Sequence, residues 1–173
     1  MTTPKDMLIR PVVASDYREI LALNTAFVEM LSPLDAVSLE ALHSIAIYFR
    51  IAEIDGEVAA FLLALAPGKK YESLNYRWFD QRSNDFIYID RIVVAAARQG
   101  QALGLCLYKD LEAFAIDGGY QRLVCEYYCE PKNIGSAKFH KKYGFTEVGH
   151  QAIQHAGKDA SKRVSMQSLV LAE

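Results

Sequence analysis

The sequence predicts a single α+β domain over residues 1–173, built around a mixed, mostly antiparallel sheet in a three-layer arrangement. Three observations support this fold class. Short apolar runs typical of strands alternate with stretches whose apolar residues recur every three to four positions, as in helices. The dipeptide Asp55-Gly56 separates two apolar runs, as in a tight hairpin. No linker, internal repeat or low-complexity segment divides the chain.

The order of the expected elements gives a sheet of about six or seven strands flanked by about four helices. They are a strand at 7–13, helices at 14–31 and 38–49, hairpin strands on either side of Asp55-Gly56, a strand at 86–94, a helix from Leu103 to Asp117, a strand at 120–129, a helix at 134–143, and strands at 145–153 and 162–171.

Turn and capping residues define these boundaries. Pro11 suits an edge strand or a strand end, because proline cannot donate to a ladder. Ser15 or Asp16 caps the first helix, which we expect Pro33 to stop. The segment 67–85 shows no usable period and is expected to be a long loop of functional importance.

Glycines end the two later helices. Leu103, Leu107 and Leu111 form an apolar stripe that stops at a pair of glycines, of which Gly118 or Gly119 supplies a left-handed C-cap. The following strand is rich in Val, Cys and Tyr, and the last helix stops at Gly144.

Composition excludes several function classes. The net charge of −2 argues against an obligate nucleic-acid binder, which would carry a basic excess. The three cysteines are scattered, which favours reduced thiols and a cytoplasmic location. The histidines are dispersed, so no metal site is expected; His43, His150 and His155 are the ones outside the last helix. With no apolar leader and no run of about 18 apolar residues, no membrane association is expected.

A strand that runs through Arg98 into Gln99-Gly100-Gln101-Ala102-Leu103-Gly104 and then a helix can bind phosphate. Backbone N–H groups at a helix N-terminus converge on one point, and the helix dipole favours negative charge there. The alternative is a turn kept small only for packing of helix on strand. A P-loop is excluded because Leu105 follows Gly104, and a Rossmann fingerprint because the spacing is wrong and the unit lies in mid-chain.

A second segment, NIGSAKFHKKYGF at 133–145, resembles the last helix and following strand of GNAT superfamily N-acetyltransferases. The turn at 99–104 lies about 30 residues upstream, as in that family, where this turn holds the pyrophosphate of acetyl-CoA. IRPVVASDYREILAL, which starts at Ile9, is similar to the family's first strand and helix. The resemblance therefore covers most of the chain and implies a GNAT-like sheet with acetyl-CoA as co-substrate and no metal.

The resemblance also implies which residues bind the cofactor. The pantetheine arm is expected on Ile92, Val93 and Val94, and the pyrophosphate on Arg98, Gln99, Gly100, Gln101, Ala102, Leu103 and Gly104. Asn133, Ser136 and Phe139 are expected to border the arm. Ala102 replaces the family's middle glycine, which is tolerable if its φ stays below zero. Lys138, Lys141 and Lys142 either assist with the adenosine phosphates or form a solvated basic face.

Acetyl transfer to an amine requires a neutral amine, so a base must remove a proton. Glu126, in the middle of an apolar strand, is the first candidate for the base, and Asp90 is the second. The alternatives are an Asp90 paired with an arginine and a merely solvated Glu126. His140 occupies the position of the family's proton-donating tyrosine, whereas Tyr143 is expected in the core.

The sequence thus points to an N-acetyltransferase that acts by direct attack of an amine in a ternary complex. The first rival is a catalytically idle CoA-binding regulatory or assembly module, and the second is a nucleotide-dependent oxidoreductase. The acceptor is a small-molecule or peptide amine that the sequence does not identify. Aromatic residues of the segment 67–85, including Trp78, are expected to cover the acceptor or to contact a second copy in a homodimer, rather than to stack on nucleic-acid bases.

Overall fold

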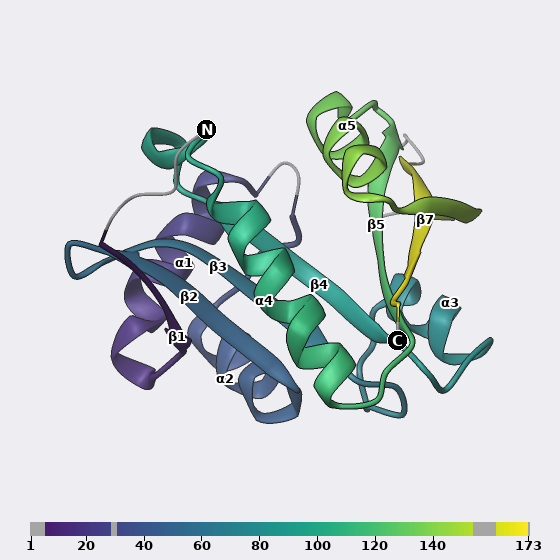
Figure 1. Ribbon diagram of the computed structural model, residues 1–173, viewed down its shortest axis with the longest axis horizontal. Coiled ribbons are helices and arrows are strands. Elements are labelled where there is room, and N and C mark those ends of the chain that lie inside the picture. Colours follow the sequence, from purple (N-terminus) through teal and green to yellow (C-terminus); the bar gives the residue numbers. More distant parts are fainter. Residues whose placement is uncertain (1–5, 29–30, 154–161, 173) are drawn as a thin grey trace. The chain divides into compact units, whose positions relative to one another are not determined.

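The computed structural model describes residues 6–28, 31–153 and 162–172. Seven strands form one mixed sheet in the order β1-β2-β3-β4-β5-β7-β6 (Figure 1). The strands are β1 (Met7–Pro11), β2 (Tyr48–Ile54), β3 (Glu57–Leu65), β4 (Ile87–Val94), β5 (Arg122–Glu130), β6 (Thr146–Ile153) and β7 (Lys162–Val170). The α-helices are α1 (Tyr17–Ala26), α2 (Ala36–Ile45), α3 (Leu74–Asp80), α4 (Leu103–Asp117) and α5 (Ile134–Tyr143). This confirms the predicted fold class.

The chain divides into two compact units. The first comprises Met1–Ala66 and Ile89–Phe114, and the second comprises Pro67–Tyr88 and Ala115–Glu173. The expectation of one domain over the whole chain stays a prediction. Among the described residues, no helix combines the length and the apolar character that crossing a membrane requires.

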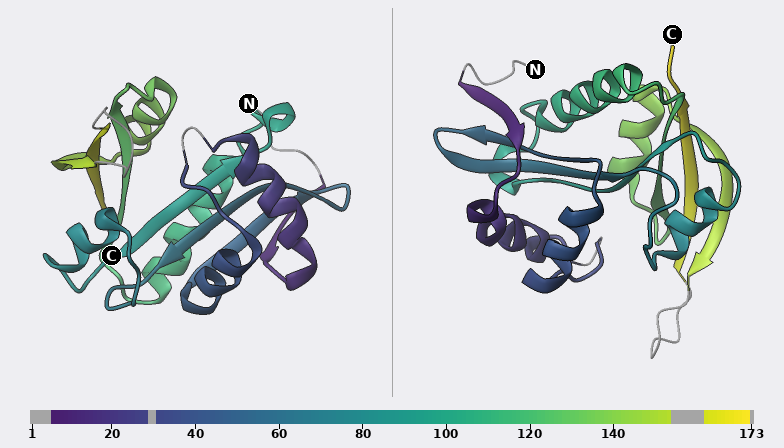
Figure 2. Two further views of the ribbon diagram at one scale, coloured as in Figure 1. Left: turned by 180° about the vertical axis from the view of Figure 1, so that it is seen from behind. Right: turned by 90° about the horizontal axis from the view of Figure 1, so that it is seen from below.

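In the first unit, the hairpin of β2 and β3 has the predicted turn. Asp55 and Gly56 have φ values of 54° and 80°, the left-handed pair that a two-residue hairpin turn requires. β1 pairs with β2 alone at the sheet edge and ends at Pro11, as expected. In Figure 2, α1 and α2 cover one face of these strands and α4 covers the other. Their apolar stripes are buried against the sheet, including Ile20 and Leu107, each with no exposed surface.

The two helices predicted at 14–31 and 38–49 extend further toward the C-terminus than α1 and α2 do. α1 ends at Ala26 with Phe27 as its C-cap, well before Pro33, although residues 29 and 30 lie outside the described part. α2 ends at Ile45, and Tyr48 and Phe49, which were expected in a helix, begin β2. Pairing with Ala64 and Leu63 of β3 places both aromatic residues in the sheet. A long-range ladder therefore overrides the local helical period.

The second unit contains the antiparallel ladders β5–β7 and β7–β6 and a short parallel ladder with β4. The parallel ladder covers two register positions, Ile87 with Leu123 and Tyr88 with Val124. Side chains alternate along β5, so Val124 and Glu126 share one face and Tyr127 lies on the other. Residues of α3 bond to the first face, and residues of α5 contact the second, so the two helices cover opposite faces.

The segment 67–85 was expected to be a loop, and α3 is a correction. The Ser73 side chain caps the helix by accepting a hydrogen bond from the backbone N–H of Tyr76 at 3.3 Å. Tyr76 and Phe79 lie three residues apart and are both buried. The cap and this spacing are the local signals that indicate the helix, but seven residues are too few to show a clear period.

Candidate functional site

The turn between β4 and α4, which is expected from the sequence to bind phosphate, belongs to the first unit. A short 3-10 helix covers Ala96–Arg98, and α4 starts at Leu103. The first hydrogen bond of α4 runs from the N–H of Cys106 to the carbonyl of Ala102 at 3.0 Å. The backbone N–H groups of the residues in between belong to the first turn, where an α-helix offers no acceptor of its own.

The environment of Gly104 distinguishes between the two explanations for a small turn, which are phosphate binding and packing of the helix on the strand. A Cβ atom at this position would lie 3.7 Å from Ile92 and 3.7 Å from Val94, which is ordinary van der Waals contact. Its φ is also outside the left-handed region. Neither packing nor backbone conformation therefore requires glycine here. Close approach of a ligand to the backbone is a reason that remains, and it agrees with anion binding at this helix N-terminus.

Ala102 does not meet the condition under which its methyl group was expected to be tolerable. That condition was a φ below zero, but the φ of Ala102 is +61°, in the left-handed region. Gly100, two residues earlier, has φ of +80°. An L-residue in the left-handed region costs about 1–2 kcal/mol relative to the right-handed one. The turn thus keeps the backbone shape of a glycine-containing turn, with a methyl group where glycine would be unstrained.

Arg98 and Gln99 flank the turn and interact with the first unit. An Arg98 guanidinium nitrogen lies 3.8 Å from the Asp55 carboxylate, and both side chains reach solvent. The Gln99 amide donates to the carbonyl of Val94 at 3.5 Å. Arg98 is therefore a surface cation near the turn, as phosphate binding would require.

The backbone register of β4 distinguishes among the three residues expected to pair with pantetheine. The N–H of Ala95 donates to the Ala59 carbonyl of β3 at 2.9 Å. Because backbone groups alternate sides along a strand, Val93 also directs its groups toward β3. Those of Ile92 and Val94 point to the opposite edge, which agrees with the contact of the Val94 carbonyl with Gln99.

Asp90, the second candidate base, is engaged with its neighbour Arg91. The Asp90 carboxylate accepts from Arg91 Nε at 2.7 Å, and the two side chains are 4% and 3% exposed. The same guanidinium donates to Asn24 Oδ1 at 2.9 Å and to Ser32 Oγ at 3.3 Å. The pairing with an arginine that was the alternative reading of Asp90 is what the structure contains.

Glu126, the first candidate base, lies in the second unit at the centre of a hydrogen-bond network on the α3 face of β5. Its Oε1 accepts from Asn75 Nδ2 at 2.7 Å and from the Tyr88 hydroxyl at 3.1 Å. Asn75 Oδ1 in turn accepts from Gln151 Nε2 of β6 at 2.8 Å. The carboxylate is half-buried and bonded by neutral donors. Sequence reasoning missed Asn75, Tyr88 and Gln151, because no local pattern relates residues so far apart in the chain.

The charge of Glu126 acts on its neighbours along β5. Burial, with a smaller contribution from the Glu126 carboxylate, raises the pKa of the Cys125 thiol well above its usual value. The same two causes raise the pKa of Tyr128. Both groups therefore stay protonated near neutral pH, and Cys125 is a poor thiolate nucleophile.

His140, the candidate acid, is 5% exposed and lies among aromatic rings. Its ring stacks on Tyr127 at a centroid distance of 5.6 Å and meets Phe139 and Phe145 edge-on. Its Nδ1 lies 2.8 Å from the Ser136 carbonyl oxygen, to which a neutral imidazole donates. Burial lowers the pKa of His140 from its usual value of 6.5, more than this hydrogen bond raises it. The neutral form is therefore favoured.

The other α5 residues assigned to the cofactor have structural roles within the second unit. The Asn133 side chain caps α5 by accepting from the N–H of Ser136 at 3.0 Å. Phe139 and Tyr143 contact each other in the same aromatic cluster as His140. These contacts explain the residue types without a ligand and leave their part in cofactor binding a prediction.

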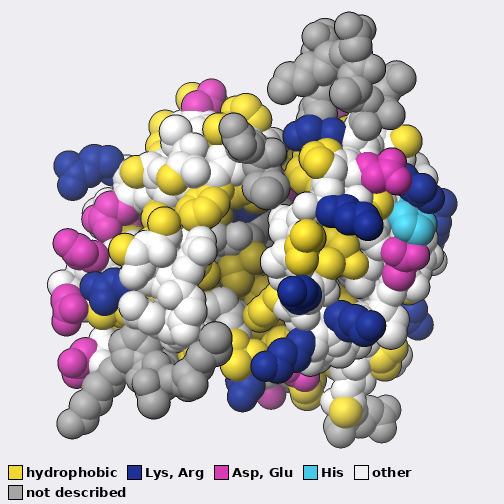
Figure 3. Space-filling model, turned by 90° about the horizontal axis from the view of Figure 1, so that it is seen from above, with side chains coloured by type: hydrophobic (Ala, Val, Ile, Leu, Met, Phe, Trp, Pro, Cys, Tyr) yellow, Lys and Arg dark blue, Asp and Glu magenta, His cyan; other side chains and the backbone are white. Residues whose placement is uncertain are grey.

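Lysines cover the outer surface of α5. Lys138, Lys141 and Lys142 are exposed. Figure 3 shows Lys and Arg side chains spread among hydrophobic ones over the right-hand surface of the view, on the second unit. The structure places these lysines in solvent, as both explanations of them require.

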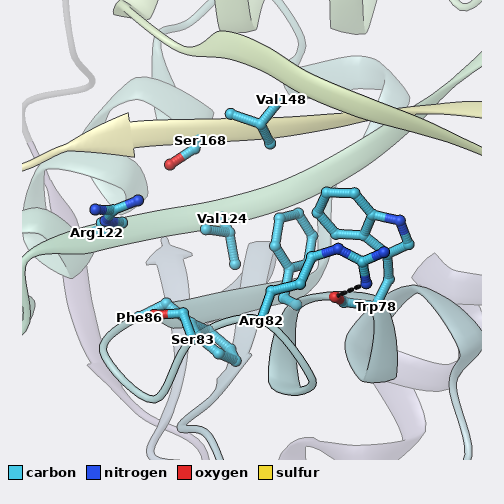
Figure 4. A pocket seen from close by; sticks show the side chains of 9 residues that line it. Trp78, Arg82, Ser83, Phe86, Arg122, Val124, Val148 and Ser168 are labelled. Atoms are coloured by element: carbon cyan, nitrogen blue, oxygen red, sulfur yellow. Dashed lines mark hydrogen bonds between the residues drawn. The ribbon is translucent and has the colours of Figure 1, made fainter.

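A pocket of about 240 Å³ lies in the second unit (Figure 4). It separates α3 and the segment after it from β5, β6 and β7. Its lining residues are Trp78, Phe79, Arg82, Ser83, Phe86, Arg122, Val124, Val148 and Ser168. The Arg82 guanidinium lies 4.0 Å above the Trp78 ring and donates to the Trp78 carbonyl at 2.7 Å. Of the aromatic residues in 67–85 that were expected to cover the acceptor, Tyr76 and Phe79 are buried, and Trp78 and Phe79 both line this pocket.

No group of metal-ligating side chains occurs among residues 6–28, 31–153 and 162–172. Within these residues, His43 bonds to the Tyr17 hydroxyl and His150 lies by Glu147, whereas His155 falls outside the described part. The three cysteines, which all lie in the described part of the chain, are not in disulfide bonds.

Comparison with known proteins gives a consistent result. The family model described as "Acetyltransferase (GNAT) family" matches residues 15–145. Among curated proteins, the sequence comparison finds no match.

Three solved structures illustrate the likeness of fold. Ard1 from Thermoplasma volcanium has a TM-score of 0.77 at 13% identity, covering 97% of this chain and 99% of that one. The ribosomal-protein-S18-alanine N-acetyltransferase from Escherichia coli has a TM-score of 0.73 at 15% identity, covering 96% and 95%. The yncA protein from Salmonella typhimurium, a putative acetyltransferase solved with its cofactor acetyl-CoA, has a TM-score of 0.73 at 19% identity, covering 98% and 96%.

Proposed function

The chain belongs to the GNAT acetyltransferase family, and from this premise we propose that it transfers the acetyl group of acetyl-CoA to an amine by direct attack in a ternary complex. The observation that carries the proposal is the turn at 99–104. It leads into the N-terminus of α4, and it contains a glycine, Gly104, that neither packing nor backbone conformation requires. A phosphate that approaches the backbone closely is a physical reason for such a residue.

The proposal assigns each part of the cofactor to residues of the chain. The pyrophosphate takes backbone N–H groups of residues 99–104, with Arg98 adding charge. The peptide-like pantetheine arm pairs with the edge of β4 to which Ile92 and Val94 direct their backbone groups, with Val93 between them. Asn133, Ser136 and Phe139 are retained as further cofactor contacts on the strength of the resemblance.

Glu126 is the better of the two candidate bases. A base must accept a proton from the ammonium form of the acceptor before the neutral amine attacks the thioester carbonyl. The Asp90 carboxylate is held by the buried Arg91 guanidinium, and loss of its charge would leave that cation uncompensated. Glu126 instead accepts hydrogen bonds from an amide and a hydroxyl, which are both neutral donors.

The neutral state of His140 opposes its role as the acid. A neutral imidazole whose Nδ1 proton is donated to the Ser136 carbonyl cannot supply that proton to a leaving thiolate without breaking the bond. Its lowered pKa reduces the charged form at neutral pH. Backbone N–H groups and solvent are then the remaining sources of stabilisation for the departing thiolate.

Calorimetry and an acceptor screen test the proposed function together. We expect acetyl-CoA to bind the purified protein, and thiol release to appear with at least one amine of a broad panel. In Glu126→Gln, thiol release should fall by about 10²–10⁴-fold, the usual contribution of a general base, with acetyl-CoA affinity retained. Glu57→Gln, which changes an exposed carboxylate at the start of β3, is the matched control. Absence of acetyl-CoA binding would refute the proposal.

A catalytically idle CoA-binding module is the second candidate. Two observations favour it: the left-handed Ala102 within the turn and the buried, neutral His140 at the position of the family's acid. This candidate gains support if acetyl-CoA binds but no amine of the panel causes thiol release.

A further inference from the structure

We infer that Asn75, held by Gln151, is a positioning residue for the Glu126 carboxylate, with Tyr88 as the second donor. The inference rests on the proposed function, because the base role of Glu126 is what gives the network a catalytic purpose. Three hydrogen bonds carry it: Gln151 to Asn75 at 2.8 Å, Asn75 to Glu126 at 2.7 Å, and Tyr88 to Glu126 at 3.1 Å.

The hydrogen-bond directions in this network are determined by its acidic end. An ionised carboxylate only accepts, so Asn75 must present its NH₂ group to Glu126. The Asn75 carbonyl oxygen then faces Gln151, which must present its own NH₂ group. Each amide therefore has one productive orientation, and the direction runs from Gln151 through Asn75 to the carboxylate.

Both donors end on the same oxygen, Oε1. Two bonds from different elements, α3 and β4, prevent rotation of the carboxylate about its last side-chain bond. They also favour the charged form, because hydrogen bonds to a carboxylate stabilise the ionised state. The network thus orients the Glu126 carboxylate, as a base requires before it accepts a proton from an ammonium group.

Packing holds α3 where Asn75 can reach Glu126. Tyr76 and Phe79, which lie one helical turn apart on the same face of α3, are buried. The Tyr76 ring meets the Tyr88 ring edge-on at a centroid distance of 5.5 Å. Trp78 lies directly over Gly149 of β6, two residues before Gln151. The helix is therefore packed against β4, which supplies Tyr88, and against β6, which supplies Gln151.

Direct titration of Glu126 tests the inference separately from activity. Carboxyl-¹³C glutamate labelling, with Glu126→Gln assigning the signal, gives the Glu126 pKa by NMR. Asn75→Leu should raise that pKa by about one unit, and Tyr88→Phe should also raise it, because each removes a donor to the charged form. Gln151→Leu should raise it less, since it acts through Asn75. Arg77→Leu, on the exposed side of α3, should leave it unchanged.

The pH dependence of turnover supplies the second readout. In Asn75→Leu the acid limb of kcat/KM should move to higher pH by the same amount as the NMR pKa, and the acetyl-CoA Kd should stay within twofold. Gln151→Leu gives an independent variant if Asn75→Leu does not fold.

The outcomes separate the inference from the proposed function. An unchanged Glu126 pKa in the folded variants overturns the inference, whatever the activity. If the NMR pKa moves while the acid limb does not, Glu126 is not the base, and the positioning role fails with it. A third outcome is that the variants shift the Glu126 pKa as expected but the wild-type protein releases no thiol with any amine. The proposed function then fails, while the network still orients Glu126 without a catalytic role.

Discussion

At the scale of single residues, Ala102 combines an L side chain with a left-handed backbone. The turn around it needs that conformation to lead β4 into α4, and Gly100 has the same sign of φ. If the middle position of the turn is strained by its methyl group, the strain should be measurable as lost stability of the free protein.

Ala102→Gly should raise the free energy of unfolding. Relief of the left-handed conformation is worth about 1–2 kcal/mol, and the greater freedom of glycine in the unfolded chain offsets about 0.5–1 kcal/mol of it. We therefore expect the free energy of unfolding, measured by urea denaturation, to rise by about 0–1.5 kcal/mol. Gly100→Ala is the matched control and should lower stability, because no atom lies within 4 Å of its added Cβ and only the backbone penalty remains. A less stable Ala102→Gly would contradict the assignment of strain.

His140 gives a prediction for stability against pH. Burial lowers its pKa in the folded state below the usual 6.5. Between the folded and unfolded pKa values the unfolded chain binds more protons, so stability decreases as pH falls below about 6.5 and levels off below the folded pKa. Each unit of lowering contributes about 1.4 kcal/mol to this loss.

Urea denaturation at pH 7.5 and pH 5.5 measures the effect. His140→Phe should lose stability less steeply between the two values than the wild type, while the exposed His150→Gln should follow the wild type. An equal pH dependence in His140→Phe would refute the buried neutral histidine. Full thiol release by a folded His140→Phe would show that His140 is not the acid.

At the scale of elements, α3 determines which partners Glu126 has. The helix docks on β6 through the Trp78 ring, which lies over Gly149. A Cβ at Gly149 would lie 2.7 Å from the Trp78 ring carbon Cζ2, closer than real contacts allow. The site chemistry therefore depends on how a short helix packs on the sheet, and this packing depends on a glycine of β6.

Gly149→Ala should displace Trp78 and lower the free energy of unfolding by about 1–3 kcal/mol, the usual cost of overpacking. Because Trp78 is the only tryptophan of the chain, its fluorescence emission should shift as well. Gly135→Ala in α5 is the control: its added Cβ would lie 3.8 Å from one Asn133 oxygen, so the change should stabilise the protein by about 0.5–1 kcal/mol. Unchanged stability and emission of Gly149→Ala would show that α3 does not depend on this contact.

At the scale of the whole molecule, one local mechanism explains the elements that the sequence predicted well. The Asp55-Gly56 hairpin, the strand that ends at Pro11 and the helix capped by Asn133 each depend on residues within a few positions of one another. Their turn and cap chemistry is readable without tertiary context. Tyr48 and Phe49 were misassigned because pairing with a neighbouring strand outweighed their local period.

The features of the candidate site also fall into those that depend on local sequence and those that depend on tertiary packing. The sequence by itself determined the family, the turn at 99–104 and the choice of Glu126 and Asp90 as carboxylates, since these depend on motifs and on residue types within single segments. Only the tertiary structure decided that Arg91 holds Asp90, that burial keeps His140 neutral, and that Asn75 and Gln151 orient Glu126. Asn75 and Gln151 are 76 positions apart, and their contact results from packing of α3 on β6, which no local pattern encodes.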